Sequence, residues 1–430
     1  MKKWYTFGLF LLCSALCQQI SSQSQLTDTP NASQQAFVGQ TIGLTDVKVV
    51  YHRPAANDRK IWGELIPYGG VWRAGANDNT VFKTSGALSF DGQKLPAGVY
   101  GLHIIPEEKS ATIIFSNNST AWGSFSYNEA EDALRVNGKI EASPAFYEHL
   151  TVEFDQIKSD GARCSFRWAD KMVSFEFKAN VHEAVLASLR QELQNKAGFT
   201  WQGWNEAANY CLNNQVNLEE GFQWATRSVF MNPNPQNMVT KARLAGLVKG
   251  EGKADKGLEI SLASLENDLS SNACTWKEYN AAALFANNNK QSDRALQWAD
   301  KAVSMSANMT TMMTKAQVLE SKGDTKKAEA VKKEAIVQGS NAELNNYGYT
   351  LLFNGKADEA IAIFKANTEK HPEDPNVWDS LGEGYYNMGK KEEAIKALKK
   401  SLSLNPPDNV KANSMRLLQL MGVEYQPNRS

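Results

Sequence analysis

The C-terminal part of the sequence repeats itself at an interval of 34 residues. The segment that starts at Asn341 and the segment that starts at Pro375 place similar residues at equal offsets. The matching positions are Tyr347-Gly348 with Leu381-Gly382, Ala360 with Ala394, Phe364 with Leu398, and Pro372 with Pro406. A period of this length is typical of units that stack because none can bury its apolar face alone. The repeat therefore predicts a helical solenoid in this part of the chain.

The second copy carries the residues of a known repeat family. It resembles the tetratricopeptide repeat (TPR), with its W, LG, Y, A and P pattern at Trp378, Leu381-Gly382, Tyr385, Ala394 and Pro406. Weaker copies upstream place one small residue on each of two helices that cross closely: Ala208 with Gly221, Ala242 with Ala254, Ala283 with Ala295, and Ala316 with Ala328. We therefore predict about six helix pairs from Trp201 to Asp408, followed by a capping helix.

The residues before the repeats show the period of β-strands. Apolar and polar residues alternate in Thr151-Val152-Glu153-Phe154 and in Ser174-Phe175-Glu176-Phe177, as in strands with one buried face. Asp91-Gly92 and Ala169-Asp170 are predicted to form hairpin turns. Many short strands with close turns favour a sandwich. The predicted fold class is multidomain β + α, an antiparallel β-sandwich followed by an all-α TPR-like solenoid.

The change of period divides the chain into domains. Val181, Val185, Leu186, Leu189 and Leu193 fall on one helical face, which predicts a linker helix. The predicted parts are a signal peptide (1–24), the β-sandwich (25–180), the linker helix (181–199), the helical repeats (200–408), and a capping helix with the tail (409–430).

The N-terminus has the features of an export signal. Lys2 and Lys3 precede a short apolar run from Phe7 to Leu16. That run is shorter than the ~20 residues that span a bilayer, and no later stretch reaches that length. Bulky Leu16 stands before Cys17, where a lipid-anchor signal needs a small residue, so soluble export is favoured over a lipid anchor. We predict an exported protein, periplasmic or secreted, with no transmembrane span.

Charge and motifs exclude several classes of function. The formal net charge is −1 and both signs are interleaved, whereas a nucleic-acid partner would need a basic patch. Cys164, Cys211 and Cys274 lie too far apart in sequence for a disulfide framework or a metal motif, and we expect buried thiols. The sequence contains no G-x-S-x-G nucleophile elbow, H-E-x-x-H motif, P-loop or G-x-G-x-x-G fingerprint. We predict no catalytic residue, metal or cofactor, and we leave enzymatic activity undecided, with a non-catalytic protein favoured.

One segment fits neither a helix nor a strand period. It reads RKIWGELIPYGGVWRAGAND, from Arg59 to Asp78. With Arg53-Pro54 before it and Leu95-Pro96-Ala97-Gly98-Val99-Tyr100 after it, the segment is similar to a family of bacterial exported proteins, the domain of unknown function 2911. The resemblance covers roughly Ser33 to Ile157 and implies no particular activity.

Two interpretations of this segment stay open. Arginine forks bind carboxylate or phosphate, and aromatic faces bind sugars or peptides, so the segment could hold an anionic or carbohydrate ligand. The candidate residues are Arg53, Arg59, Trp62, Tyr68, Trp72, Arg73 and Asn77. In the second interpretation the segment closes one end of the sandwich. Its tryptophan rings then fill the core and its arginines pair with Asp58, Glu64 or Asp78.

The repeats predict a different kind of site. Stacked helix pairs form a concave groove lined by the first helices. In the last two units the groove candidates are Asn345, Tyr349, Leu352, Asn376, Asp379, Glu383 and Tyr386. We therefore predict that the solenoid binds a protein or peptide partner. The alternative function is an enzyme or a carbohydrate- or anion-binding module centred on the Arg/Trp segment.

Overall fold

The computed structural model describes residues 30–425, so the predicted signal peptide lies outside the described residues. Two compact units make up the chain, Met1–Ser188 and Leu189–Ser430. Each unit is described by itself below. No helix in the described part is long and apolar enough to cross a membrane.

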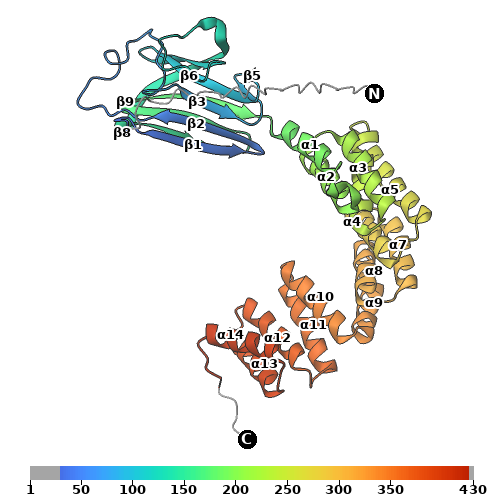
Figure 1. Cartoon of the computed structure of the whole chain (residues 1–430). Helices are drawn as coiled ribbons and strands as arrows, with labels where there is room; N and C mark the ends of the chain where they lie inside the picture. The colour runs from blue at the N-terminus through green and yellow to red at the C-terminus, as the bar shows by residue number, and fades with distance from the viewer. Residues whose placement is uncertain (1–29, 426–430) are drawn as a thin grey trace, which may run out of the picture. The chain divides into compact units, whose positions relative to one another are not determined.

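The first unit contains one antiparallel sheet (Figure 1). The strands that the structure describes are β1 (Gln35–Ile42), β2 (Thr45–His52), β3 (Thr80–Thr84), β4 (Leu88–Phe90), β5 (Gln93–Leu95), β6 (Gly98–Pro106), β7 (Ser110–Ser116), β8 (Asp132–Asp155) and β9 (Gly161–Ala179). Their order is β1-β2-β3-β6-β7-β8-β9-β4-β5, with β1 and β5 as the open edges.

The sheet curves over its own core. The Phe82 ring on β3 lies 6.4 Å from the rings of Phe175 and Phe177 on β9, although β3 and β9 are not neighbours in the sheet. Phe115 on β7 lies 5.9 Å from Phe175. The two halves of the sheet therefore face each other across a layer of aromatic rings, as the predicted sandwich requires. One continuous open sheet supplies both layers.

One predicted hairpin is present and the other is wrong. Asp91 and Gly92 join β4 to β5 with φ of 48° and 84°, the left-handed pair that a tight hairpin needs. Ala169 also has a positive φ, 51°, but β9 runs straight through it. The register between β8 and β9 shifts on both sides of the Tyr147–Ala169 pair, but the extra residues lie on β8, so β9 continues as a strand where a turn was predicted.

The second unit is helical. Its helices, preceded by α1 (Val181–Glu192), are α2 (Trp201–Asn214), α3 (Leu218–Met231), α4 (Pro235–Lys249), α5 (Ala254–Ser271), α6 (Trp276–Asn288), α7 (Ser292–Met305), α8 (Met309–Ser321), α9 (Thr325–Gln338), α10 (Asn341–Phe353), α11 (Ala357–Lys370), α12 (Pro375–Asn387), α13 (Lys391–Ser403) and α14 (Asp408–Leu420). Each even-numbered helix from α2 to α12 packs against the helix that follows it. Six helix pairs and a final helix therefore form the solenoid within the described residues.

Small residues set the crossing of most pairs. A Cβ at Gly382 would lie 2.6 Å from Leu398, so the last pair needs glycine there. The predicted alanines are buried in three weaker pairs, but Ala254 is exposed at the start of α5. Gly257 makes that close approach instead, because a Cβ on Gly246 of α4 would lie 2.5 Å from its carbonyl oxygen.

Each first helix also contacts the first helix of the next unit, from α2 with α4 through α12 with α14. The first helices therefore line one continuous side of the solenoid. Four of them, α4, α6, α8 and α10, begin with reciprocal capping hydrogen bonds, which fix where each helix starts.

Candidate functional site

The segment between β2 and β3, residues 53–79, is called the β2–β3 segment. Two of its predicted site arginines form hydrogen bonds with neighbouring backbone. Arg53 donates from Nε to the carbonyl oxygen of Leu150 and from Nη2 to the Thr151 hydroxyl, both at 2.9 Å. Arg59 donates to the carbonyl oxygens of Ala56 at 2.9 Å and Ala55 at 2.7 Å. The expectation that these arginines pair with acidic residues is wrong, because their hydrogen bonds go mainly to the main chain.

Two predicted tryptophans belong to the core of the sheet domain. Trp62 is 4% exposed and donates its Nε1 proton to the carbonyl oxygen of Trp168 at 2.9 Å. The Trp72 ring lies edge-on to Trp62 at 5.8 Å and stacks on Trp168 at 6.0 Å. Tyr68 packs against the same core, and its hydroxyl accepts a 2.8 Å hydrogen bond from Lys171. These three rings therefore pack in or against the core of the sheet domain, as in the second interpretation of the segment.

Arg73 and Asn77 lie at the end of the segment. Arg73 donates from Nη1 to the Asn77 carbonyl oxygen at 2.5 Å, and the Asn77 side chain donates to the Ser33 carbonyl oxygen at 3.1 Å. Burial lowers the pKa of Arg73, while the negative charge of Asp78 acts in the opposite direction. The guanidinium lies over two rings from another loop, 5.5 Å from Trp122 and 5.1 Å from Phe125. Arg53, Arg59 and Arg73 thus bind different partners and do not share a site.

A pocket of about 280 Å³ opens beside Arg73. Its walls come from Leu65, Val71 and Trp72 on one side and from Ser124 and Phe125 on the other. The Ser124 hydroxyl lies 2.9 Å from Nδ1 of His103. Burial is the main cause that lowers the pKa of His103 to about 4, so its imidazole is neutral at pH 7.

The second wall of this pocket, Ser124 and Phe125, was not predicted from the sequence. The sequence signal for this wall is the pair of aromatic residues in TAWGSF, from Thr120 to Phe125. This stretch does not show the alternation of a strand. Acidic residues Glu129, Glu131 and Asp132 follow closely in the sequence. Asp132 is engaged within the fold, because it accepts hydrogen bonds from Arg135 at 2.6 Å and from the Tyr127 hydroxyl at 2.7 Å.

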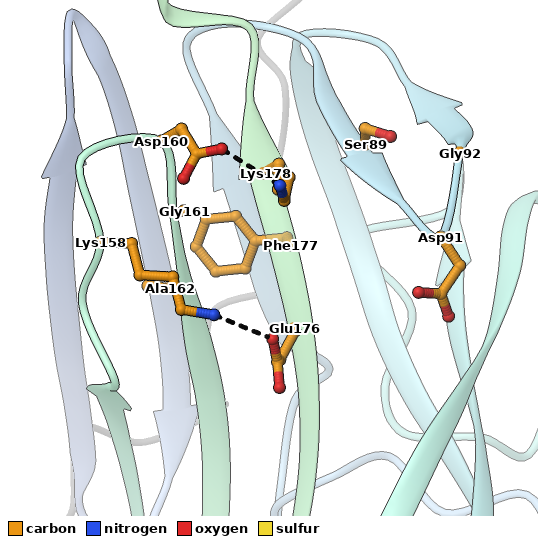
Figure 2. Close-up of a pocket in the computed structure, with 10 residues that line it drawn as sticks. All are labelled: Ser89, Asp91, Gly92, Lys158, Asp160, Gly161, Ala162, Glu176, Phe177 and Lys178. Carbon is orange, nitrogen blue, oxygen red and sulfur yellow. Dashed lines mark ion pairs between the residues drawn. The ribbon is translucent and has the colours of Figure 1, made fainter.

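A second pocket in the sheet domain, of about 190 Å³, lies beside the β8–β9 turn and contains none of the predicted residues. Lys158 pairs with Glu176 at 3.6 Å and Lys178 pairs with Asp160 at 3.2 Å. Figure 2 shows these two ion pairs on either side of the Phe177 ring. Because its lysines are paired with carboxylates, this pocket offers an anion little net charge.

The groove candidates on α12 are less accessible than predicted. Asp379 is only 5% exposed and accepts hydrogen bonds from Ser414 and Asn413 of α14. Burial is the main cause that raises its pKa. Glu383 accepts a 2.9 Å hydrogen bond from the Tyr349 hydroxyl of α10. The final helix therefore covers Asp379, and this residue is not open to a partner.

The remaining candidates divide between packing and the groove. Leu352 and Tyr386 are half-buried and pack against the core of the last repeats. Asn376 lies in the first turn of α12, where its backbone N–H donates to Asp374 at 2.8 Å. Asn345 is half-buried, and its side-chain oxygen is buried without a hydrogen bond among the described residues.

That unsatisfied amide recurs along the first helices. Asn205 of α2, Asn280 of α6 and Asn345 of α10 are each the fifth residue of their helix. In the described structure all three side-chain oxygens are buried and have no hydrogen-bond partner. The fifth residue of α12 is Asp379, whose partners are supplied by α14. No group of His, Cys, Asp and Glu within residues 30–425 is arranged to hold a metal ion.

Comparison with known proteins agrees with this division. Residues 33–177 match the family model described as "Protein of unknown function (DUF2911)", and residues 375–408 match a tetratricopeptide repeat model. No curated protein matches the sequence.

Solved TPR structures show low similarity. A TPR protein from Parabacteroides merdae is 16% identical, with 56% of this chain and 91% of that chain covered and a TM-score of 0.27. YrrB, "a TPR protein with an unusual peptide-binding site", is 14% identical, with 53% and 97% covered and a TM-score of 0.22. The Cut9–Hcn1 structure is 15% identical with a TM-score of 0.26; the match covers 55% of this chain but only 45% of that one.

Proposed function

We propose that this is an exported protein of the cell envelope, periplasmic or secreted, whose solenoid binds an extended segment of a protein partner along its first helices. The observation that carries the proposal is the row of asparagines Asn205, Asn280 and Asn345. A buried polar group without a partner costs about 1–3 kcal/mol, so the fold alone gives no reason to keep three of them.

An extended peptide suits these amides. A peptide backbone presents both N–H donors and C=O acceptors, and an asparagine side chain can satisfy either kind. Rotation of the amide by half a turn exchanges its oxygen and nitrogen, so each side chain can adapt to a peptide group. The contrast with Asp379 supports this assignment, because the same position is satisfied where α14 supplies the donors.

Selection of peptides tests this function directly. The full-length protein is panned against a random peptide library, and the affinities of selected peptides are measured for the wild type and for Asn280→Ala/Asn345→Ala. Each lost hydrogen bond is expected to weaken binding about fivefold. Asn267→Ala is the matched control, because Asn267 is exposed on the second helix α5. Selection of no peptide, or equal losses in the control, contradicts the proposal.

Export is a separate part of the proposal and needs its own experiment. It rests on the basic and apolar N-terminal segment of the sequence. Mass spectrometry of the protein isolated from its native cells should find it outside the cytoplasm and shortened near residue 24. Full-length protein in the cytoplasm would contradict export and leave peptide binding untouched.

The alternative function is a ligand-binding module, and fewer of its candidate residues are available to a ligand than the sequence suggested. Arg53, Arg59, Trp62 and Tyr68 are engaged in holding the sheet domain together. Of the candidate residues in this segment, Trp72 and Arg73 line a pocket.

A further inference from the structure

Two large aromatic side chains are exposed next to Arg73. Trp122 is 60% exposed and Phe125 is 79% exposed, and their rings stack at 5.8 Å with an angle of 19°. We call Arg73, Trp122 and Phe125 the aromatic clamp. Exposed apolar groups that gather beside a pocket are typical of binding surfaces, whereas single exposed residues are ordinary.

The backbone of the 122–125 loop is shaped to admit the arginine. Gly123 has a φ of +77°, and a Cβ at that position would lie 2.4 Å from Cζ of Arg73. A glycine therefore allows the guanidinium to approach the loop. Arg73 uses one of its five N–H groups on the Asn77 carbonyl oxygen, and an arginine stays cationic at any ordinary pH. Its other N–H groups are the main source of donors for a ligand at this edge of the pocket.

Ser124 supplies a second polar group to the pocket. Its hydroxyl contacts Nδ1 of His103, which is only 2% exposed. When a neutral His103 donates from Nδ1, the serine oxygen accepts, and the serine proton is free to point to a ligand. The rest of the lining that the structure describes, including Leu65, Ile66 and Val71, is mainly apolar.

We propose that this pocket binds a small organic carboxylate with a planar apolar group. The carboxylate contacts the Arg73 guanidinium and the Ser124 hydroxyl, and the planar group lies against the Phe125 ring, which lines the pocket. A single cation matches one negative charge, and the negative charge of Asp78 opposes a dianion such as phosphate. A sugar would need several convergent polar groups, and the described lining provides few.

The geometry does not favour a hydrolytic role for Ser124. With a pKa of about 4, His103 is a weak base at neutral pH. The carboxylate that could orient it, Asp132, instead accepts hydrogen bonds from Tyr127 and Arg135. The contact between His103 and Ser124 therefore holds the serine hydroxyl in place for binding.

Calorimetric titration of the full-length protein tests the proposal with two defined probes, phenylacetate and its neutral analogue phenylacetamide. We expect saturable binding of phenylacetate at one site and at least about tenfold weaker binding of phenylacetamide, because only the anion pairs with the guanidinium. Equal binding of both probes, or no saturation by phenylacetate at millimolar concentration, overturns the proposal. So does displacement of phenylacetate by equimolar sulfate, which would indicate a general anion site.

Two variants and one control variant locate the site. Phe125→Ala should weaken phenylacetate binding about tenfold and Ser124→Ala about fivefold. Phe230→Ala is the matched control, because Phe230 is an exposed ring of the solenoid with Arg227 over it at 5.3 Å. Unchanged affinity in Phe125→Ala, or an equal loss in Phe230→Ala, contradicts the assignment. Peptide selection by the solenoid is independent of these outcomes, so the two proposals can fail separately.

Discussion

The β2–β3 segment and the first helices of the solenoid were both candidate binding sites from the sequence, and they differ in one physical respect. In the segment, Arg53, Arg59 and Trp62 direct their donors to carbonyl oxygens or a hydroxyl of the same domain. On the first helices, Asn280 and Asn345 keep a buried oxygen without a partner within the described chain. Both regions are rich in aromatic, amide and charged residues.

The difference teaches that satisfaction of hydrogen bonds, and not composition, separates a structural element from a binding surface. A satisfied polar group stabilises the fold, and its presence needs no ligand. An unsatisfied one costs stability until a partner supplies the missing bond. Mutations should therefore have opposite effects on stability in the two regions.

The largest effect is expected from Trp62→Ala. The ring is buried among Trp72 and Trp168, and its removal leaves a cavity and an unpaired carbonyl oxygen. We expect a loss of about 3–5 kcal/mol in the free energy of unfolding of the sheet domain. Urea unfolding followed by pulsed hydrogen exchange and mass spectrometry measures this for peptides of β3 and β6.

Trp122→Ala is the matched control for that substitution, since Trp122 is also a tryptophan of the sheet domain but is largely exposed. It should leave the unfolding free energy nearly unchanged. Equal losses in the two variants would mean that the β2–β3 segment is not the structural element inferred here.

The second prediction concerns pH and the buried imidazole of His103. Its pKa is about 4 in the folded protein and about 6.5 when unfolded, so the unfolded state takes up the proton first as pH falls. The neutral form of His103 therefore contributes fully to the free energy of unfolding above about pH 6.5. This contribution is lost as the pH falls towards 4. The difference between the two pKa values corresponds to about 3 kcal/mol.

Replacement by an apolar ring tests this dependence. His103→Phe should remove that part of the pH dependence, measured as the difference from the wild type in urea unfolding between pH 7 and pH 4. Ser124→Ala keeps the imidazole and should retain the dependence. Identical pH profiles for wild type and His103→Phe would show that His103 does not titrate in this way.

The helical repeats could be predicted from the sequence because their close contacts join helices that are adjacent in the chain. The glycine and alanine positions report contacts between helices that are adjacent in the chain, such as Gly382 with Leu398. The prediction failed at Ala254, where the close crossing moved to Gly257 within the same helix. It failed again at Ala169-Asp170, because Ala169 takes a positive φ within β9 and the strand continues in its pairing with β8.

The candidate sites were harder to predict because they depend on contacts distant in sequence. Arg73 meets Trp122 and Phe125 only after β3 to β7 bring the two loops together. Asp379 was assigned to an open groove from its place on a first helix, but α14 packs over it. Neither fact follows from period or composition.

The third prediction reverses the sign of the first. Asn345→Leu replaces a half-buried amide, whose oxygen has no hydrogen-bond partner among the described residues, with an apolar side chain of similar size. We expect the solenoid to become more stable by about 1 kcal/mol, measured by the same pulsed exchange on peptides of α10 and α12. Asn267→Leu, at an exposed position, should change little. Destabilisation by Asn345→Leu would mean that the amide is already satisfied, and the contrast between the two regions would fail.

The smallest effect is expected from Arg59→Ala, and its size identifies the kind of bond that the arginine makes. A buried ion pair that loses one partner costs about 3–5 kcal/mol, because the remaining charge is stranded. Arg59 is exposed and donates to two neutral carbonyl oxygens, so we expect a loss of about 1 kcal/mol or less. Lys60→Ala is the control, since its pairing with Glu64 lies on the open surface and should not change stability measurably. A loss as large as that of an ion pair would show that Arg59 has an acidic partner in solution and would restore the interpretation drawn from the sequence.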